Sequence, residues 1–189
     1  MVRRDMVKVG ITGHLSGLGK ELYTRIPNSV GFDIGTHRNR QIANFDIKNP
    51  DPWIDELYEC DVFINNAYDG FHQVDMLGKV FMKWIKEDKM IINISSTASE
   101  RWDINYQMGF YPIHKKALDE AGMLLQHIEK KCRIVNVKLG WMDTPRKLPN
   151  SVSDTDKMSV HDVATKIINV MNDKDITSIT IEGPWQKLN

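Results

Sequence analysis

Short apolar, β-branched runs alternate with amphipathic stretches along almost the whole chain. The apolar runs are continuous rather than interrupted at every second position, which is typical of strands buried on both faces. They predict strands over residues 7–12, 30–34, 42–46, 61–65, 90–95, 134–139 and 176–181. Between them, apolar residues recur at three- to four-residue spacing. This periodicity predicts helices over residues 17–26, 52–58, 74–85, 111–130 and 161–171.

The alternation of buried strands and helices predicts an α/β fold. Helices between strands favour right-handed crossovers and a doubly wound, Rossmann-type parallel sheet of about seven strands with helices on both faces. A length of 189 residues suits one domain with a substantial core, so residues 1–189 are expected to form a single domain. One long irregular connection, residues 141–158, follows a late strand, and we expect a substrate loop there.

A glycine-rich turn, TGHLSGLG over residues 12–19, joins the first predicted strand to the first helix. Gly13 permits a tight turn, Gly17 lets a pyrophosphate approach the backbone, and Gly19 lets the helix pack against the strand. The strand before it and the helix after it are the context that such a motif requires. The motif has no Gly-Lys-Ser/Thr ending, which disfavours ATP. The predicted phosphate contacts are Gly13, His14, Ser16, Gly17, Leu18 and Gly19, with a solvent-facing loop role as the simpler alternative for His14.

The spacing Thr-Gly-x-x-x-Gly-x-Gly resembles the short-chain dehydrogenase/reductase family. Further motifs follow in that family's order: Asp46-Ile47 after the third strand, Asn65-Asn66-Ala67-Tyr68 where the family has Asn-Asn-Ala-Gly, Ser95-Ser96 ending the fifth strand, Tyr111-x-x-x-Lys115, and Gly140 with Thr144 after the sixth strand. Each motif alone is weak evidence for the family. The resemblance depends on their occurrence in the family's order along nearly the whole chain.

The resemblance implies an NAD(P)-dependent oxidoreductase that interconverts a small carbonyl and an alcohol. Tyr111 would be the acid or base, and Lys115 would support it and bind the nicotinamide ribose. Ser96 would hold the substrate oxygen, and Thr144 the carboxamide. The same resemblance places Asp46 and Ile47 beside the adenine and Asn66 and Ala67 along the adenosine side. Independently, a four-residue spacing puts Tyr111 and Lys115 on one helical face, where an ammonium stabilises a phenolate.

The chain departs from the family pattern near the proposed catalytic residues. Tyr111 follows Ser96 by fifteen positions, slightly more than usual, which leaves Ser95 and Thr97 as alternative hydroxyls. Pro112 disfavours helical geometry at Tyr111, so the helix is expected to begin or bend there. The family's further active-site asparagine has no clear counterpart, and Asp75 is the nearest residue by position.

The choice between NAD and NADP depends on the end of the second strand. A carboxylate at Asp33 would bond the ribose hydroxyls and repel a 2′-phosphate, which favours NAD. If that strand extends to Gly35, Arg38 would instead meet the ribose and could hold the phosphate of NADP. We therefore expect NAD, with NADP as the alternative.

Composition limits the classes of binding partner and the cellular location that we expect for the protein. Net charge is zero, and a generic nucleic-acid or membrane-surface partner needs a basic excess, so neither is expected. No apolar run approaches a membrane span, and no signal-peptide pattern is present. The two cysteines, Cys60 and Cys132, lack metal-ligand spacing. These features indicate a cytoplasmic protein with reduced thiols, no metal site and a small-molecule substrate.

The predicted helix over 111–130 carries more apolar surface than one sheet face needs, which favours a homodimer or homotetramer, as is common in the family. Its apolar residues include Ala117, Ala121, Met123, Leu124, Leu125 and Ile128. Two other functions remain open. One is a dinucleotide-binding sensor or scaffold without turnover, favoured by the missing asparagine. The other is a relative that modifies nucleotide sugars, for which the chain has little room.

Overall fold

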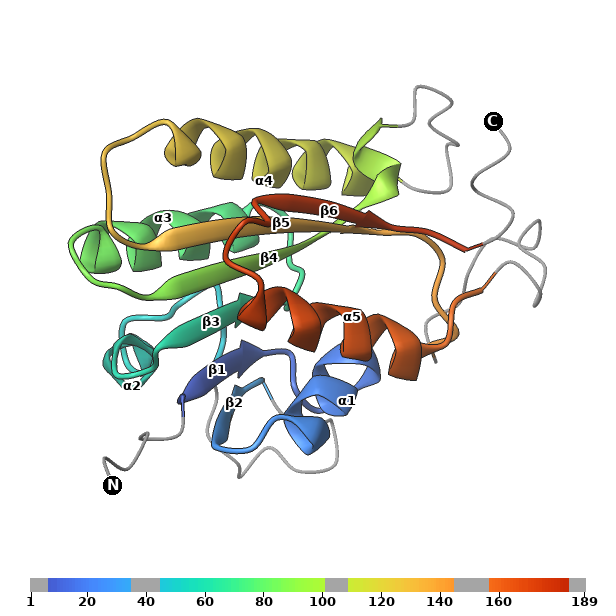
Figure 1. Cartoon of the computed structure of the whole chain (residues 1–189), viewed down its shortest axis with the longest axis horizontal. Helices are drawn as coiled ribbons and strands as arrows, with labels where there is room; N and C mark the ends of the chain where they lie inside the picture. Colours follow the sequence, from blue (N-terminus) through green and yellow to red (C-terminus); the bar gives the residue numbers. More distant parts are fainter. Residues whose placement is uncertain (1–6, 35–44, 101–108, 145–156, 184–189) are drawn as a thin grey trace.

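The structure, a computed structural model, describes residues 7–34, 45–100, 109–144 and 157–183. Its elements alternate between strand and helix from end to end (Figure 1). The strands are β1 (Val9–Thr12), β2 (Ser29–Phe32), β3 (Val62–Asn65), β4 (Met90–Ser96), β5 (Arg133–Leu139) and β6 (Ser178–Ile181). The helices are α1 (Gly17–Arg25), α2 (Ile54–Tyr58), α3 (His72–Trp84), the short 3-10 helix η1 (Thr97–Glu100), α4 (Tyr111–Gln126) and α5 (Val160–Asn172).

The strands of the described residues form one parallel sheet with the order β2-β1-β3-β4-β5-β6. This confirms the predicted doubly wound α/β architecture. The described residues contain six strands, where about seven were predicted for the chain. Of the predicted strand 42–46, residues 42–44 lie outside the described residues, and Phe45 and Asp46 are not in a strand. The Phe45 N–H donates a hydrogen bond to the Asp33 carbonyl. The Asp46 carboxylate then accepts a hydrogen bond from the Lys48 N–H, and the chain turns there.

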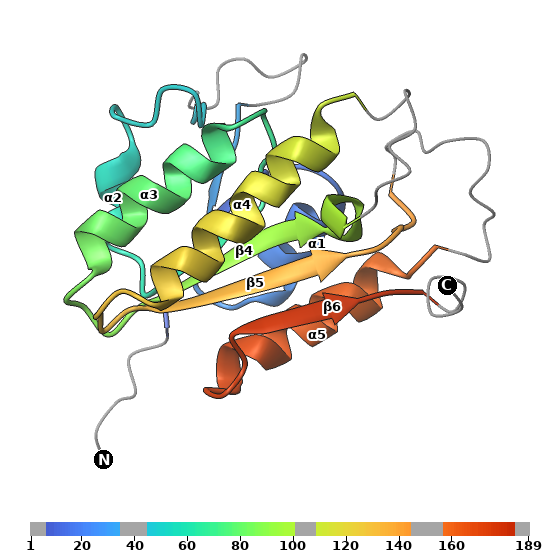
Figure 2. The same cartoon turned by 90° about the horizontal axis from the view of Figure 1, so that it is seen from above.

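Helices cover both faces of the sheet, as predicted. In Figure 2, α3 and α4 lie side by side over one face while α1 and α5 lie under the other. The buried residues follow this division, because strand side chains point alternately to either face. Leu18 and Leu22 of α1 share a core with Val163 and Ile167 of α5. Residues of α2, α3 and α4 share a second core, which includes Leu57, Met76, Phe81 and Leu118.

The strand order reverses direction at β1. The chain runs outward from β1 to β2 and then returns to β3 on the other side of β1. Connections that leave in opposite directions open a crevice at the carboxyl ends of β1 and β3, where doubly wound folds bind their ligands. The glycine-rich turn after β1 and residues 66–68 after β3 therefore lie at one edge of the sheet.

Element ends differ from the sequence predictions by one or two residues in most cases. The largest shift is in α4, which ends at Gln126 rather than residue 130. Pro112 occupies the first turn of α4, where a missing N–H costs no hydrogen bond, and Tyr111 is the first helical residue. The helix thus begins at Tyr111, which was one of the two predicted outcomes. Within the described residues, no helix combines the length and apolar character needed to cross a membrane.

Candidate functional site

The glycine-rich turn has the backbone geometry of an anion cradle. Gly13 has φ +73° and Gly17 has φ +51°, a left-handed conformation that side chains with a Cβ rarely adopt. A Cβ on Gly19 would lie 2.0 Å from the Gly13 carbonyl oxygen, so helix α1 can close against the turn only with glycine there. Gly13 therefore forms the tight turn and Gly19 the close helix packing that the sequence predicted, while the approach of a pyrophosphate at Gly17 remains a prediction.

The amino-terminal end of α1 is open for a negatively charged group. Ser16 is the N-cap residue, yet its side chain caps no backbone N–H. The first N–H groups of a helix have no intrahelical partner and carry partial positive charge. Thr144 approaches the same end, with its Cγ2 3.7 Å from the position of a Cβ on Gly17. The arrangement fits a phosphate group at the start of α1, and the contact of Thr144 with a carboxamide remains a prediction.

Hydrogen bonds between Thr12 and residues 66 and 67, which follow β3, join the glycine-rich turn to the neighbouring strand. The Thr12 hydroxyl accepts hydrogen bonds from the N–H groups of Asn66 and Ala67, each at 3.0 Å. The Asn66 amide donates to the Thr12 carbonyl at 2.9 Å. Asn66 and Ala67 thus stabilise the crevice directly, and their contact with the adenosine side remains a prediction.

Lys115 and Tyr111 lie one turn apart on α4, and the lysine is held from several sides. Its side chain is 3% exposed. The ammonium donates to the Gln73 side-chain oxygen and to the Ile94 carbonyl, both at 2.8 Å. It also lies 5.6 Å from the centre of the Tyr111 ring and 5.3 Å from that of Tyr68. Both of these acceptors are neutral oxygens, so they orient the ammonium without neutralising its charge.

Gln73 is the site residue that the sequence interpretation missed. Its side chain is buried in α3, donates to the Asn65 and Ile94 carbonyls, and accepts from Lys115. Asp75, the residue chosen by position, is instead exposed on α3 and pairs with His72 at 3.3 Å. The two residues are half a turn apart, so a shift of two positions reverses the helix face. A glutamine at a buried position within an amphipathic stretch was the only available signal.

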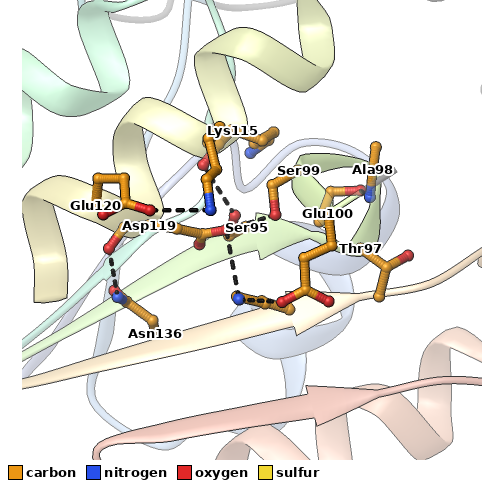
Figure 3. Close-up of polar contacts among 12 residues, drawn as sticks. Ser95, Thr97, Ala98, Ser99, Glu100, Lys115, Asp119, Glu120 and Asn136 are labelled. Atoms are coloured by element: carbon orange, nitrogen blue, oxygen red, sulfur yellow. Dashed lines mark hydrogen bonds and ion pairs between the residues drawn. The ribbon is translucent and has the colours of Figure 1, made fainter. Parts of the chain in front are cut away.

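Ser95 and Ser96 point their hydroxyls to different elements, because neighbouring residues of a strand face opposite sides. The buried Ser95 hydroxyl donates to the Lys115 carbonyl at 3.4 Å, so it lies under α4 (Figure 3). The half-buried Ser96 hydroxyl accepts from the Ala98 N–H at 3.2 Å and starts η1. Thr97 is buried and its hydroxyl lies 3.5 Å from the Leu139 carbonyl. Of the three hydroxyls, Ser96 is the least enclosed.

A buried carboxylate lies beneath these residues. Asp119, one turn after Lys115 on α4, accepts a hydrogen bond from the Ser99 hydroxyl at 2.5 Å (Figure 3). Lys138 of β5 lies 3.9 Å from the same carboxylate and bonds Glu100. Burial raises the pKa of Asp119, while the Ser95 and Ser99 hydroxyls and the two lysine charges oppose that rise. The carboxylate therefore connects η1 to α4 directly behind the candidate serine.

Three asparagines cross the centre of the sheet side by side. Asn65, Asn93 and Asn136 pair in register on β3, β4 and β5, and all three are buried. Asn65 donates to Asn93 at 3.1 Å, and Asn93 donates to Asn136 at 3.0 Å. Asn65 also donates to the Gln73 carbonyl of α3, and Asn136 to the Asp119 carbonyl of α4. This row fixes α3 and α4, and so Gln73 and Lys115, against one sheet.

Two predicted phosphate contacts use their side chains for packing. The Leu18 side chain belongs to the core, so only its backbone faces the cradle. His14 is half-buried, rather than the solvent-facing loop residue of the simpler alternative. Its ring lies 4.8 Å from that of Tyr23 and so close to Gly31 that a Cβ there would come within 2.3 Å. Its Nδ1 is buried and has no hydrogen-bond partner among the described residues.

Asp33 lies directly beyond β2 and faces the glycine-rich turn, where its carboxylate accepts from the Leu15 N–H at 3.0 Å. This places a negative charge beside the cradle. Arg38, the alternative contact, lies outside the described residues. Ile47 packs into the core and also borders an open groove of about 450 Å³ next to α3. Pro50 and Val74 line the same groove, and so do the polar side chains Lys48, His72, Asp75 and Lys79.

Solved structures share this architecture over nearly the whole chain. A short-chain dehydrogenase/reductase from Vibrio parahaemolyticus matches with TM-score 0.70 and 18% identity, over 92% of this chain and 98% of its own. The chain has the short-chain dehydrogenase/reductase fold. A short chain dehydrogenase from Burkholderia cenocepacia in complex with NADP gives TM-score 0.74 at 16% identity, over 96% and 90% of the two chains.

A 4-hydroxyisoleucine dehydrogenase complexed with NADH also has this short-chain dehydrogenase/reductase fold, with TM-score 0.73 at 16% identity over 97% of this chain and all of that one. No family model and no curated protein sequence matches the chain. The shared architecture is therefore supported by structural similarity and not by a sequence match. The roles of individual residues rest on the geometry described above.

Proposed function

We propose that the protein is an NAD(P)-dependent oxidoreductase that interconverts a carbonyl and an alcohol. The observation that carries this proposal is the Lys115 ammonium against the Tyr111 ring, at the same sheet edge as the glycine cradle. Neither feature alone specifies a reaction. Together they combine a site for a dinucleotide phosphate with a phenol whose neighbour is an oriented cation.

A bound nicotinamide dinucleotide would supply or accept the hydride. The protein's own residues manage the proton and the substrate oxygen. Tyr111 donates a proton to the carbonyl oxygen, or accepts one from the alcohol in the reverse direction. The positive charge of Lys115 stabilises negative charge that develops on the phenolic oxygen. The Ser96 hydroxyl donates a hydrogen bond to the substrate oxygen, and Gln73 keeps Lys115 in place.

The cofactor would lie along the crevice. Gly13, Ser16, Gly17, Leu18 and Gly19 would hold the phosphates with backbone groups. Ile47 and the groove beside it would hold the adenine, Lys115 the ribose hydroxyls, and Thr144 the carboxamide. Asp33 lies where its carboxylate favours free ribose hydroxyls over a 2′-phosphate, which supports NAD as the preferred cofactor.

Titration with NADH and NADPH tests this proposal, with binding followed by tryptophan fluorescence. We expect NADH to bind more tightly than NADPH. Asp33→Ala should weaken NADH binding by about tenfold or more, because it removes a charged hydrogen-bond acceptor. It should also reduce the difference in affinity between NADH and NADPH. Asp88→Ala, at an exposed carboxylate in the turn between α3 and β4, is the control and should change neither. Failure of both dinucleotides to bind at millimolar concentration would contradict the proposal.

A preference for NADPH that is unchanged by Asp33→Ala would contradict the NAD assignment while leaving the oxidoreductase proposal intact.

A further inference from the structure

Two helices of the candidate site begin with the same local structure. Gly70-Phe71 precedes α3 and Gly109-Phe110 precedes α4. Gly70 has φ +56° and Gly109 has φ +53°. Phe71 has φ −81° and ψ −8°, and Phe110 has φ −82° and ψ −1°. Each glycine takes the left-handed conformation that side chains disfavour, and each phenylalanine is the N-cap residue of its helix.

A phenylalanine is an unfavourable N-cap residue. Ser, Thr, Asp and Asn are preferred there because their side chains accept a hydrogen bond from the first turn, and neither phenylalanine makes such a bond. Both rings also remain in solvent, with Phe71 51% and Phe110 71% exposed. Neither local stability nor core packing therefore accounts for them. Departures from local rules of this kind are typical of functional positions.

The two phenylalanines lie on either side of one histidine of α4. The His114 ring is 4.4 Å from that of Phe71, edge to face, and 6.3 Å from that of Phe110. Gly70 adjoins the same histidine: a Cβ there would lie 3.8 Å from His114 Cε1, an ordinary contact, so it is the backbone conformation that favours glycine at this position. His114 in turn bonds the Tyr68 hydroxyl through Nδ1 at 2.8 Å.

Tyr68 connects this group to the candidate catalytic residue. Its ring lies 4.8 Å from that of Tyr111, at 76° to it. Tyr68 stands where the resembling family has a glycine, so the chain carries an added ring at this position. We call Tyr68, Phe71, Phe110 and His114 the aromatic wall. It forms a continuous row of rings from the exposed surface to Tyr111.

The aromatic wall offers an apolar surface despite its two polar side chains. The Tyr68 hydroxyl and the His114 Nδ1 bond each other, so these two atoms do not require a polar partner from a ligand. Asp69, on the loop before α3, pairs with Lys48 at 2.9 Å, and His72 pairs with Asp75 at the start of α3. Rings held by such contacts lose little freedom when another ring packs on them.

We propose that the aromatic wall binds the ring of an aromatic aldehyde, ketone or alcohol and presents its reacting C–O group to Tyr111. This inference rests on the proposed function and names the substrate class of that site. An aromatic ring is the occupant that the wall favours, because aromatic side chains pair edge to face or offset with other rings. A small aliphatic substrate would leave Phe71 and Phe110 in solvent and gain nothing from them.

Fluorine NMR tests the wall without any turnover. The chain has six phenylalanines, so protein labelled with 4-fluorophenylalanine gives a small set of signals. Phe71→Leu and Phe110→Leu assign the two signals of the wall. With benzyl alcohol as the probe, these two should shift in a saturable manner, while the buried Phe32, Phe63 and Phe81 stay unchanged. Propan-1-ol, the aliphatic control, should shift neither.

Kinetics tests the same surface with benzaldehyde and acetaldehyde as substrates. Phe71→Ser and Phe110→Ser should each lower kcat/KM for benzaldehyde by roughly tenfold, mainly through KM, and leave acetaldehyde unchanged. Serine is a preferred N-cap residue, so these variants should fold at least as well as the parent. Met82→Ser, at another exposed apolar position, is the matched control and should change neither substrate.

The outcomes separate the two proposals. Shifts at Phe71 and Phe110 with benzyl alcohol, without turnover of any substrate in a broad panel of aldehydes, ketones and alcohols, would support the aromatic wall and overturn the oxidoreductase function. Turnover of both aldehydes with no loss in the serine variants would overturn the aromatic wall alone. Signals that fail to shift with benzyl alcohol, or that shift with protein concentration alone, would also overturn it, the latter by assigning the surface to a second copy of the chain.

Discussion

At the scale of single residues, Ser95 and Ser96 show how one position along a strand changes the chemistry available. The Ser95 hydroxyl is engaged with the backbone of α4, while the Ser96 hydroxyl bonds only the start of η1 among its described contacts. The sequence left these two residues as alternatives, because consecutive serines look alike until the strand face is known. Because the Ser96 hydroxyl is the less enclosed of the two, we propose Ser96 as the residue that meets a substrate.

Alanine substitution separates the two serines. We expect Ser96→Ala to lower kcat by about a hundredfold, since a donor to the developing oxyanion is lost, and to leave NADH affinity unchanged. Ser95→Ala should instead lower the free energy of unfolding by about 1 kcal/mol through the lost hydrogen bond, with a small effect on rate. Steady-state kinetics and urea unfolding measure both. The reverse pattern would show that Ser95 is the active hydroxyl.

At the scale of elements, the Asp119 carboxylate joins η1 to α4 and makes that junction sensitive to pH. Its pKa is raised by burial above the ordinary value of 3.8. A group with a raised folded-state pKa stabilises the fold fully below its unfolded pKa, and this contribution is lost as pH rises through the folded value. The junction should therefore gain stability relative to a neutral analogue as pH falls.

Asp119→Asn is the comparison that isolates this effect. Compared with the variant, the parent protein should gain free energy of unfolding when the pH is lowered from 7 toward 4, because only the parent takes up a proton at this position. Urea unfolding at several pH values measures the difference. Asp75→Asn, on the exposed face of α3, is the control. A difference between parent and Asp119→Asn that stays constant with pH would contradict the expectation.

The elements themselves were largely predictable from sequence, because their periodicity comes from local burial. The glycine cradle and the position of Tyr111 and Lys115 on one helical face followed from residue spacing alone. The end of the predicted strand 42–46 did not, because Phe45 and Asp46 are not in a strand, and a short apolar run carries no information about whether a partner strand is available. The chain turns at Asp46 through a local side-chain hydrogen bond.

The less predictable features depend on contacts between distant segments. Gln73 lies 42 residues from Lys115 along the chain, and only the packing of α3 against α4 brings them together. The orientation of His14 depends on Gly31 of a neighbouring strand, which leaves room for the ring. The aromatic wall likewise joins the β3 loop, the entry to α3 and the start of α4. No local sequence pattern specifies such contacts between distant segments.

At the scale of the whole molecule, α3 and α4 form an outer layer that carries exposed apolar side chains. Leu124 is 64% exposed, and Ile113 and Met123 of α4 and Met82 of α3 are also exposed. The two helices lie side by side on one face of the sheet (Figure 2). We infer that this layer pairs two copies of the chain, in keeping with the apolar surplus predicted for the α4 helix.

Leu124→Glu tests this pairing by placing a charge in the apolar layer. We expect the parent to be a dimer or tetramer in light scattering at micromolar concentration, and the variant to shift toward the monomer. Ile34→Glu, at an exposed apolar residue beyond β2, is the control and should leave the assembly unchanged. A monomeric parent protein at that concentration would contradict the inference.

The reaction assigned to the molecule as a whole depends most directly on Tyr111. Tyr111→Phe keeps the ring against Tyr68 and Lys115 and removes only the phenolic oxygen. The decisive measurement is turnover of the parent and of this variant, followed at the nicotinamide absorbance band over a panel of aldehydes, ketones and alcohols, with NADH affinity measured in parallel. We expect the parent to turn over at least one substrate, and the variant to lose about 10²- to 10⁴-fold in kcat with nearly unchanged NADH affinity. Full activity in Tyr111→Phe, or a parent that binds NADH tightly yet converts nothing across the panel, would contradict the account.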